Sequence, residues 1–404
     1  MASISTEHSP SPVVLRRILT LWPLILYGLG VIVGAGIYVA MGAVLNRAGP
    51  AAPLSFLLAG LAAGLTGLCY AELAGRFPEA SGSVAYVRHG FQSERLAGLT
   101  GLGITLAVAI STASIASGTV QYLAALLPLP ASLLITLVIS CATAIAMIGV
   151  GESVGVAGAI GVLEIAGLLA ATAAGFVAAP ELHFDGMVPM TISGWSGVAA
   201  GAFIAYFAFI GFETLANMGE EVKAPQRTLP LGILGALAIS IGLYLLVVTA
   251  VVMSDRTSGN PLMGLFEGKS LSVFAAVGVL AVGNGVLVQV VMLSRLLYGM
   301  AKRDQLPAFL APDFLSQVHP RTHTPIHATL VAGGVVLVVT LLVPFERLLV
   351  LANAITLAVF TLVDLALWRL RRAGPPASGF HAPIWVAPAA AAFSAALLLS
   401  EILL

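Results

Sequence analysis

Long apolar stretches occupy most of this 404-residue chain, and they constrain its fold more than any other feature. A helix that crosses a bilayer needs about 20 apolar residues. Lipid offers no partners for unpaired backbone groups, so stretches of this length predict membrane-spanning helices. Eleven stretches qualify: 21–46, 52–75, 96–127, 131–149, 154–178, 194–218, 229–253, 271–302, 325–344, 347–370 and 383–404.

The composition agrees with a polytopic all-α membrane protein. Hydrophobic residues make up 59% of the chain and charged residues only 9%, which excludes a soluble protein of this size. The stretches are too long for the strands of an outer-membrane barrel. The first stretch follows Arg16 and Arg17 and is too long for a cleaved signal peptide. Cys69 and Cys141 lie inside predicted spans, so we expect packing roles and no disulfide.

The lysines and arginines predict the orientation, because they accumulate in cytoplasmic loops. With residues 1–20 as a flexible cytoplasmic N-terminus, eleven spans place the C-terminus outside. This predicts a multi-pass protein of the inner cell membrane. The cytoplasmic set is Arg16, Arg17, Arg76, Arg88, Arg95, Lys223, Arg227, Arg295, Lys302, Arg303, Arg321, Arg369, Arg371 and Arg372, and the outer set is Arg47, Arg256, Lys269 and Arg347.

Two of the spans contain glycine near their middle. Gly34-Ala35-Gly36 lies within the first stretch, and Gly211 lies within the segment Phe207–Glu213 of the sixth. Weakened spans at equivalent places of two chain halves are typical of secondary transporters with a binding site at the bilayer midplane. We therefore expect two inverted repeats, 21–178 and 194–370, with 383–404 standing outside them. Close helix packing through small residues is the alternative explanation of the first glycine pair.

An interrupted helix exposes backbone groups that suit a zwitterion. Unwinding around Gly34 would free amides at the positive end of a half-helix, where a carboxylate binds. It would also free the carbonyl of Ile32 for an ammonium group. In the sixth span Gly211 permits a second break, which offers the carbonyls of Phe207 and Ile210. Phe207 is placed to cover a bound ligand, unless it is an ordinary core aromatic.

Several motifs together resemble the amino acid–polyamine–organocation (APC) permeases, over residues 20–370. The resemblance implies a 5+5 inverted-repeat, LeuT-like fold with discontinuous helices 1 and 6, and amino acid transport by alternating access. The motifs are Gly-Ala-Gly-Ile-Tyr in the first span, Ala-Glu-Leu-Ala-Gly-Arg-Phe-Pro at 71–78, Phe-Ile-Gly-Phe-Glu-Thr at 209–214, Pro-Gln-Arg-Thr-Leu-Pro at 225–230 and Ser-Arg-Leu-Leu-Tyr-Gly-Met-Ala-Lys-Arg-Asp-Gln-Leu-Pro at 294–307.

The resemblance also implies a set of binding residues. Backbone amides would hold the substrate carboxylate, backbone carbonyls would hold its amino group, and Phe207 would be the gate. In such permeases the side-chain pocket comes from spans 3, 6, 8 and 10. The amides would be those of Ala35, Gly36 and Ile37 beside Gly34, the carbonyls those of Ile32, Phe207 and Ile210, and the pocket Ala113, Ser114, Ser117, Gly211 and Asn284.

Two acids lie near the middle of predicted spans, Glu164 in the fifth and Glu213 in the sixth. A charged carboxylate there costs a few kcal/mol, so it must find partners, face a cavity or carry a proton. In some proton-coupled relatives a lysine stands where Glu164 falls. We therefore predict that Glu164 binds the coupling proton, with Glu213 as the second candidate. A structural hydrogen bond between spans remains the alternative for Glu164. For Glu213 it is the role that the family implies, since a Glu there ties the break to its neighbours.

Other chemistries find little support. Sodium coupling near the eighth span needs hydroxyl oxygens, but 273–288 contains no Ser or Thr. His319, His323 and His327 have helical spacing, yet Pro320 and Pro325 interrupt any single helix, so no metal site is expected. The chain has no nucleophile-elbow, zincin or phosphate-loop motif. We expect no enzyme activity, cofactor or nucleic-acid partner.

The sequence thus predicts a proton-coupled transporter of amino acids, with a neutral, apolar substrate favoured because the expected pocket carries no extra charge. Membrane lipid, the amino acid and a proton are its expected partners. A proton-independent amino acid/polyamine exchanger is the main alternative, and a channel or receptor on the same fold is another. The chain ends after the eleventh span where most of the family have twelve, so the sequence leaves the oligomeric state open.

Overall fold

The computed structural model describes residues 17–403 except 80, 150–153, 180–185, 258, 304–311 and 375–378. These residues form helices joined by short loops, with a single β-bridge, between Leu19 and Val222, among the described part of the chain. The elements are α1 (Leu21–Ala48), η1 (Gly49–Ala51), α2 (Ala52–Arg76), α3 (Gly82–Phe91), α4 (Glu94–Ala124), α5 (Ala131–Ile148), α6 (Val154–Ala178), α7 (Ile192–Ala205), η2 (Tyr206–Phe209), α8 (Phe212–Ala216), α9 (Pro225–Met253), η3 (Met263–Leu265), α10 (Gly268–Lys302), α11 (Pro312–Leu315), α12 (Ile326–Leu342), α13 (Phe345–Ala373) and α14 (Val386–Leu403).

The long helices are those expected to cross a membrane. By length and apolar composition, 8 segments of the described chain are candidates, and the first, Leu21–Arg76, contains both α1 and α2. Two shorter apolar helices, Ile326–Leu342 and Val386–Glu401, lie near the C-terminal end. Each of the eleven predicted stretches contains one of these helices, the sixth being α7, η2 and α8 in succession. The prediction of an all-α membrane protein is confirmed.

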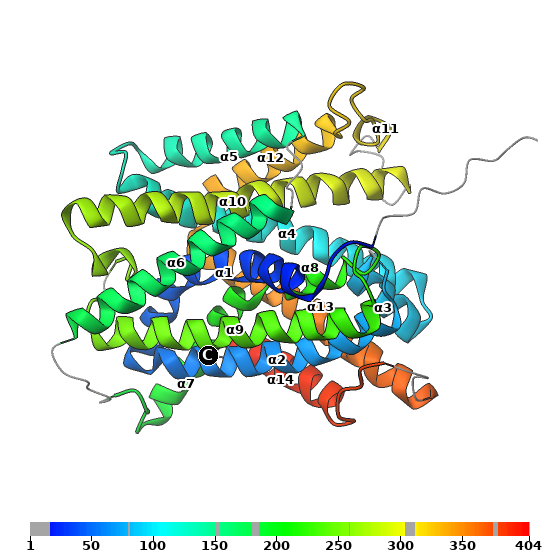
Figure 1. Cartoon of the computed structure of the whole chain (residues 1–404), viewed down its shortest axis with the longest axis horizontal. Helices are drawn as coiled ribbons and strands as arrows, with labels where there is room; N and C mark the ends of the chain where they lie inside the picture. The colour runs from blue at the N-terminus through cyan, green and yellow to red at the C-terminus, as the bar shows by residue number, and fades with distance from the viewer. Residues whose placement is uncertain are drawn as a thin grey trace, which may run out of the picture.

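Spans of the first half of the chain pack against the corresponding spans of the second half. In terms of the spans, the first packs against the sixth (α1 with α7 and η2), the second against the seventh (α2 with α9), the third against the eighth (α4 with α10) and the fourth against the ninth (α5 with α12). Figure 1 shows α5 and α12 together at one edge of the molecule, with α2, α7 and α14 toward the opposite edge. Two inverted repeats would produce such pairing if corresponding spans met near a pseudo-two-fold axis; the repeats themselves, 21–178 and 194–370, stay a prediction.

The sixth span is interrupted as expected, but the first is not. Helix α1 runs without a break from Leu21 to Ala48, whereas α7 ends at Ala205 and α8 begins only at Phe212. The prediction of a discontinuous first helix is therefore corrected. Glycine permits unwinding without requiring it, and in α1 the missing side chains serve close packing instead. A Cβ on Gly36 would lie 2.6 Å from the Cα of Ala208 in η2.

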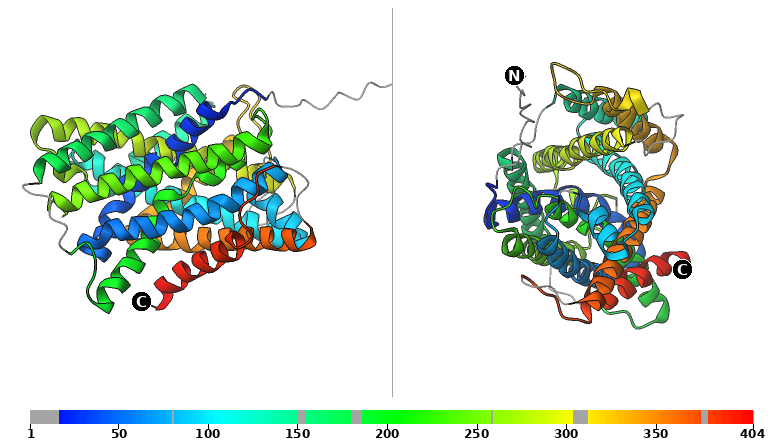
Figure 2. Two further views of the ribbon diagram at one scale, coloured as in Figure 1. Left: turned by 60° about the horizontal axis from the view of Figure 1, so that its bottom comes forward. Right: turned by 90° about the vertical axis from the view of Figure 1, so that its right-hand side faces the viewer.

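A buried ion pair fastens the ends of three spans together. Glu72 of α2 is fully buried and accepts from both Nε (3.0 Å) and Nη2 of Arg371 on α13. The backbone N–H of Ala382, just before α14, also donates to Glu72, at 2.9 Å. Figure 2 shows α14 (red) at the outside of the bundle, next to α13 (orange). Since charge-assisted bidentate pairs are strong and directional, Glu72 and Arg371 position α13 and α14 against α2.

We predict that Arg371→Met destabilises the folded protein by about 3 kcal/mol, because it leaves the Glu72 carboxylate buried without its main partner. Arg372→Met is the matched control, since Arg372 is exposed and stacks on Trp368. Chemical unfolding of the purified protein measures both. Equal losses for the two variants would contradict the structural role of the Arg371 pair.

Candidate substrate site

The interruption of the sixth span takes a short stretch of backbone out of the helix near the middle of the molecule. After the 3₁₀ turn η2, Ile210 is extended (φ −61°, ψ 136°) and Gly211 has φ 127°. Residues with a side chain rarely adopt such a positive φ, so Gly211 is required here. A Cβ on Gly211 would also lie 3.0 Å from Cγ1 of Val31 on α1. The break therefore combines a special backbone conformation with close contact to the first span.

Two polar side chains close the start of α8. The Gly211 N–H donates to Oε2 of Glu213 at 2.8 Å, and the Thr214 hydroxyl donates to the Gly211 carbonyl at 2.6 Å. A carboxylate at the first turn of a helix satisfies a free amide and interacts favourably with the helix dipole. Glu213 thus stabilises the break, as the family resemblance implies. Whether it also carries a proton stays a prediction.

Tyr244 of α9 connects the two spans that are expected to bind substrate. Its buried hydroxyl lies 2.8 Å from the carbonyl oxygen of Ile32 and 2.9 Å from that of Ala208, as donor to both acceptors. The single hydroxyl hydrogen is therefore shared or alternates between them. The Ile32 carbonyl, predicted to bind an ammonium group, already accepts a hydrogen bond from outside its own helix.

Glu164 of α6 lies directly against the first span. Its side chain is 1% exposed, and its carboxyl group occupies the position that a Cβ on Gly34 would take. The hydroxyl of Tyr38 donates to the backbone carbonyl of Glu164 at 2.9 Å. The glycine in α1 is what allows the carboxyl group to approach the helix so closely. Any movement of α1 at Gly34 must therefore involve Glu164.

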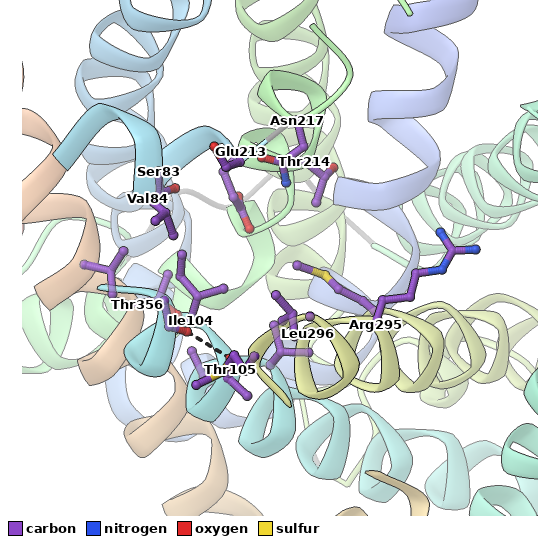
Figure 3. Close-up of a pocket in the computed structure, with 18 of the residues that line it drawn as sticks. Ser83, Val84, Ile104, Thr105, Glu213, Thr214, Asn217, Arg295, Leu296 and Thr356 are labelled. Atoms are coloured by element: carbon purple, nitrogen blue, oxygen red, sulfur yellow. Dashed lines mark hydrogen bonds between the residues drawn. The ribbon is translucent and has the colours of Figure 1, made fainter. Parts of the chain in front are cut away.

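A cavity of about 450 Å³ reaches the interruption of the sixth span. Its deep end is lined by Val31, Ile210 and Gly211, and its mouth lies near Arg88 and Arg303. In Figure 3 the side chain of Glu213 points into the space between α3, α4 and α10, whereas the guanidinium of Arg295 points away from it. The cavity is large enough for a small metabolite and open to solvent on one side.

Aromatic side chains fill the opposite side of the break. The rings of Tyr38, Tyr122 and Phe274 pack with centroids 6.0 to 6.4 Å apart, and the Tyr122 hydroxyl donates to the Tyr38 carbonyl at 2.9 Å. Phe207 is only 3% exposed. Neither Phe207 nor these three aromatic residues line the cavity.

The structure brings together only some of the predicted site residues. Three of them line the cavity: Ile210, Gly211 and Glu213. The others do not line the cavity and are buried or half-buried; the Ser114 hydroxyl, for example, donates to the Ile110 carbonyl of its own helix at 3.0 Å. The residues outside the lining are Glu164, described above, and Ile32, Gly34, Ala35, Gly36, Ile37, Ala113, Ser114, Ser117, Phe207 and Asn284, whose roles stay predictions.

Sequence reasoning missed a polar cluster at the deep end of the cavity. Gln289 of α10 accepts from the Thr112 hydroxyl at 3.1 Å and donates to the Ser111 hydroxyl at 3.4 Å, and both Gln289 and Ser111 line the cavity. Gln289 directly follows the segment 273–288 that lacks hydroxyl side chains. An amide inside a long apolar span was the available signal.

Comparisons with known proteins show the family of the chain. The sequence profile described as amino acid permease matches residues 19–403. The chain is 32% identical over 395 residues to the methylthioribose transporter of Bacillus subtilis, with 89% of this chain and 82% of the relative covered. It is 30% identical over 412 residues to the branched-chain amino acid permease BcaP of the same species, with 92% and 84% covered.

A plant relative is longer. The cationic amino acid transporter 9, chloroplastic, of Arabidopsis thaliana is 32% identical over 350 residues, which are 79% of this chain and 60% of the relative. The chain thus spans less than two thirds of that protein. The names of the three relatives differ in substrate, so similarity alone leaves the substrate open.

Two glycine-to-alanine substitutions test the contact between Gly36 and η2. Gly36→Ala is expected to destabilise the protein by about 1–3 kcal/mol, because the new methyl group meets the backbone of Ala208. Gly64→Ala in α2, where a Cβ would meet nothing within 4 Å, is expected to be neutral or stabilising by up to about 1 kcal/mol. Melting temperatures of the two purified variants test this. A Gly36→Ala protein as stable as Gly64→Ala would rule out the close packing.

Proposed function

The chain belongs to the amino acid permease family, and from this premise we propose that it is a secondary transporter of neutral amino acids. The family and the transporter relatives make it a transporter and not an enzyme. The observation that supports the proposal most directly is the cavity that ends at Ile210 and Gly211. Backbone groups at such a break provide both charges that a zwitterion needs.

Binding of the carboxylate requires a local change in α1. The amides of Ala35, Gly36 and Ile37 are proposed as its donors, yet they lie within a continuous helix. Two glycines in one turn reduce the cost of opening the helix there, because glycine adopts many backbone conformations. The Tyr244 hydroxyl already bonds to the Ile32 carbonyl and is placed to hold it when the turn opens. The substrate would then bridge the opened turn and the break at Gly211.

The charges around the cavity favour a neutral substrate. At the mouth Arg88 forms an ion pair with Glu94 at 2.9 Å, and inside the cavity Glu213 accepts from the Gly211 N–H. At the deep end the apolar side chains of Val31, Val108 and Ile210 dominate, with Ser111 and Gln289 as the polar groups. A neutral side chain enters such a space without leaving a buried charge unpaired.

Under the proposed orientation, the cavity opens toward the cytoplasm. Arg88, Arg295 and Arg303, which line it, all belong to the predicted cytoplasmic set, and the positive-inside rule places that set on the inner face. The aromatic contacts around Tyr38 then close the outer side. In alternating access, the protein would change between this inward-open state and a state that opens to the outer side of the inner cell membrane, with Phe207 as the proposed gate.

We assign the coupling proton to Glu164. Its carboxyl group is buried against Gly34, at the turn of α1 that must open. Protonation removes a charge from this contact, and deprotonation restores it, so the proton state of Glu164 would bias the conformation of α1. In relatives that carry a basic residue here, binding of the proton would add a positive charge instead of removing a negative one. A proton-independent exchanger is the alternative mechanism.

Glu164→Gln tests the assignment, because glutamine imitates the protonated acid. In liposomes we expect the variant to keep exchange between internal and external amino acid while accumulation driven by a pH gradient falls to the level reached without one. Glu346→Gln, at an exposed position, is the control and should behave as the wild type. Full pH-driven accumulation by Glu164→Gln would exclude Glu164 as the proton carrier and favour the exchanger.

The substrate class is tested by thermal stability of the purified protein with individual amino acids. A ligand that binds only the folded state stabilises it by RT ln(1 + [L]/Kd), about 2.7 kcal/mol at a hundredfold excess over Kd. We expect neutral amino acids with apolar side chains to raise the melting temperature more than lysine, arginine or glutamate. A larger shift with a cationic amino acid would contradict the neutral class.

A further inference from the structure

A further acidic side chain, that of Asp364, is buried where four helical elements meet. Asp364 of α13 faces Thr66 of α2, Ser394 of α14 lies beside Thr66, and Tyr206 begins η2. Tyr206 and the three other side chains are 0% exposed. The helices α2, α7 with η2, α13 and α14 all pack against one another at this place, and Figure 2 shows α14 running beside α13. We call this group the four-helix junction.

The polar atoms of the four-helix junction are incompletely bonded. The Thr66 hydroxyl donates to Oδ2 of Asp364 at 3.1 Å and lies 3.4 Å from the Ser394 hydroxyl. Among the residues that the structure describes, Oδ1 of Asp364 and the hydroxyl of Tyr206 have no hydrogen-bond partner. Buried polar atoms usually have one, so two orphans in one cluster indicate an occupant that completes it.

The charges nearby do not neutralise Asp364. No ion pair with Asp364 occurs in the described part of the chain, and Arg371, two turns along α13, is bound to Glu72. The titratable groups that face Asp364 from its neighbours are acidic or neutral. They are Cys69, Tyr70 and Glu72 on α2, Tyr206 on η2 and Glu213 on α8; on α14 the Ser394 hydroxyl faces it, and Glu401, near the far end, pairs with Arg47.

The Thr66 hydroxyl and the weakly donating Cys69 thiol are the donors that face Asp364, so an ionised carboxylate in this setting is unfavourable. Burial of an unpaired charge costs several kcal/mol, and a carboxylate can accept about four hydrogen bonds. A proton bound at Oδ1 removes the charge and gives the group a donor, which a small rotation can direct to a carbonyl or to the Tyr206 hydroxyl. The rings of Tyr70 and Phe360 meet with centroids 5.4 Å apart, and Phe360 lines the cavity, so an aromatic layer separates Asp364 from the substrate site.

We propose that Asp364 is a separate proton-binding site at the four-helix junction and that its proton affects the interruption of the sixth span. The proton is transferred from a hydronium ion of the solvent: one O–H bond of the hydronium breaks as the O–H bond at Oδ1 forms, and a water molecule is released. Tyr206, its neighbour in the junction, is the first residue of η2 and directly precedes Phe207. Loss of the proton places a negative charge beside η2. This charge would shift the equilibrium between conformations of the interruption that follows η2. The site is separate from Glu164 and does not depend on the proposed function.

Asp364→Asn provides the test, because asparagine has the shape of a protonated aspartate. If the folded protein keeps a proton that the unfolded chain releases, the stability of the wild type falls as pH rises. Between pH 5 and 8 the melting temperature of purified wild type should therefore fall relative to that of Asp364→Asn, by about 2 °C per pH unit. Asp255→Asn, the same change at an exposed position, should run parallel to the wild type.

Four outcomes are informative. A wild-type melting temperature that falls relative to that of Asp364→Asn as pH rises supports the proton site, and a change in the opposite direction overturns it. Repeating the comparison in the Glu164→Gln background distinguishes Asp364 from Glu164. Parallel curves at all pH values show a hydrogen-bonding role only and overturn the proposal. A melting temperature of the wild type that rises with NaCl but not with choline chloride, and that Asp364→Asn abolishes, identifies a sodium site and also overturns it.

Discussion

The rest of the structure depends on one constraint: backbone groups inside a membrane must be bonded within the protein. The sixth span breaks its helix at Ile210 and Gly211, and side chains supply the missing partners. Glu213 accepts from the Gly211 amide, Thr214 donates to the Gly211 carbonyl, and Tyr244 bonds to the carbonyl of Ala208. Because these partners come from α8 and α9, the break is held in place by the helices around it. The cavity ends where this held segment begins.

Glycine plays different parts in the two central spans. At Gly211 the backbone conformation itself requires glycine, whereas Gly34 and Gly36 lie in a regular helix and provide space. Gly36 allows η2 to approach α1, and Gly34 allows Glu164 to do so. The same small residues therefore make α1 a tightly packed helix here and leave it able to open. The proposed binding mechanism relies on both properties.

The acids in the interior of the protein have different roles because their surroundings differ. Glu72 is bound by Arg371 and serves to join helices, and Glu213 caps a short helix. Glu164 packs against the first span, and Asp364 lies at the four-helix junction with a single hydroxyl donor. In the sequence all four are acids in or near apolar stretches. The full burial of Asp364 follows from the packing of α14 over α2 and α13, which no local pattern reveals.

The sequence by itself determined which segments form the long apolar helices, because apolar length is a local property and lipid leaves a segment of that length no regular structure other than a helix. It also located the break at Gly211. Only the tertiary structure decided that α1 stays continuous, since a glycine pair permits both states and the contacts of Gly36 with Ala208 favour the helix. Which residues line the cavity, Gln289 among them, depends on how distant helices meet, and that is set by packing along the whole chain.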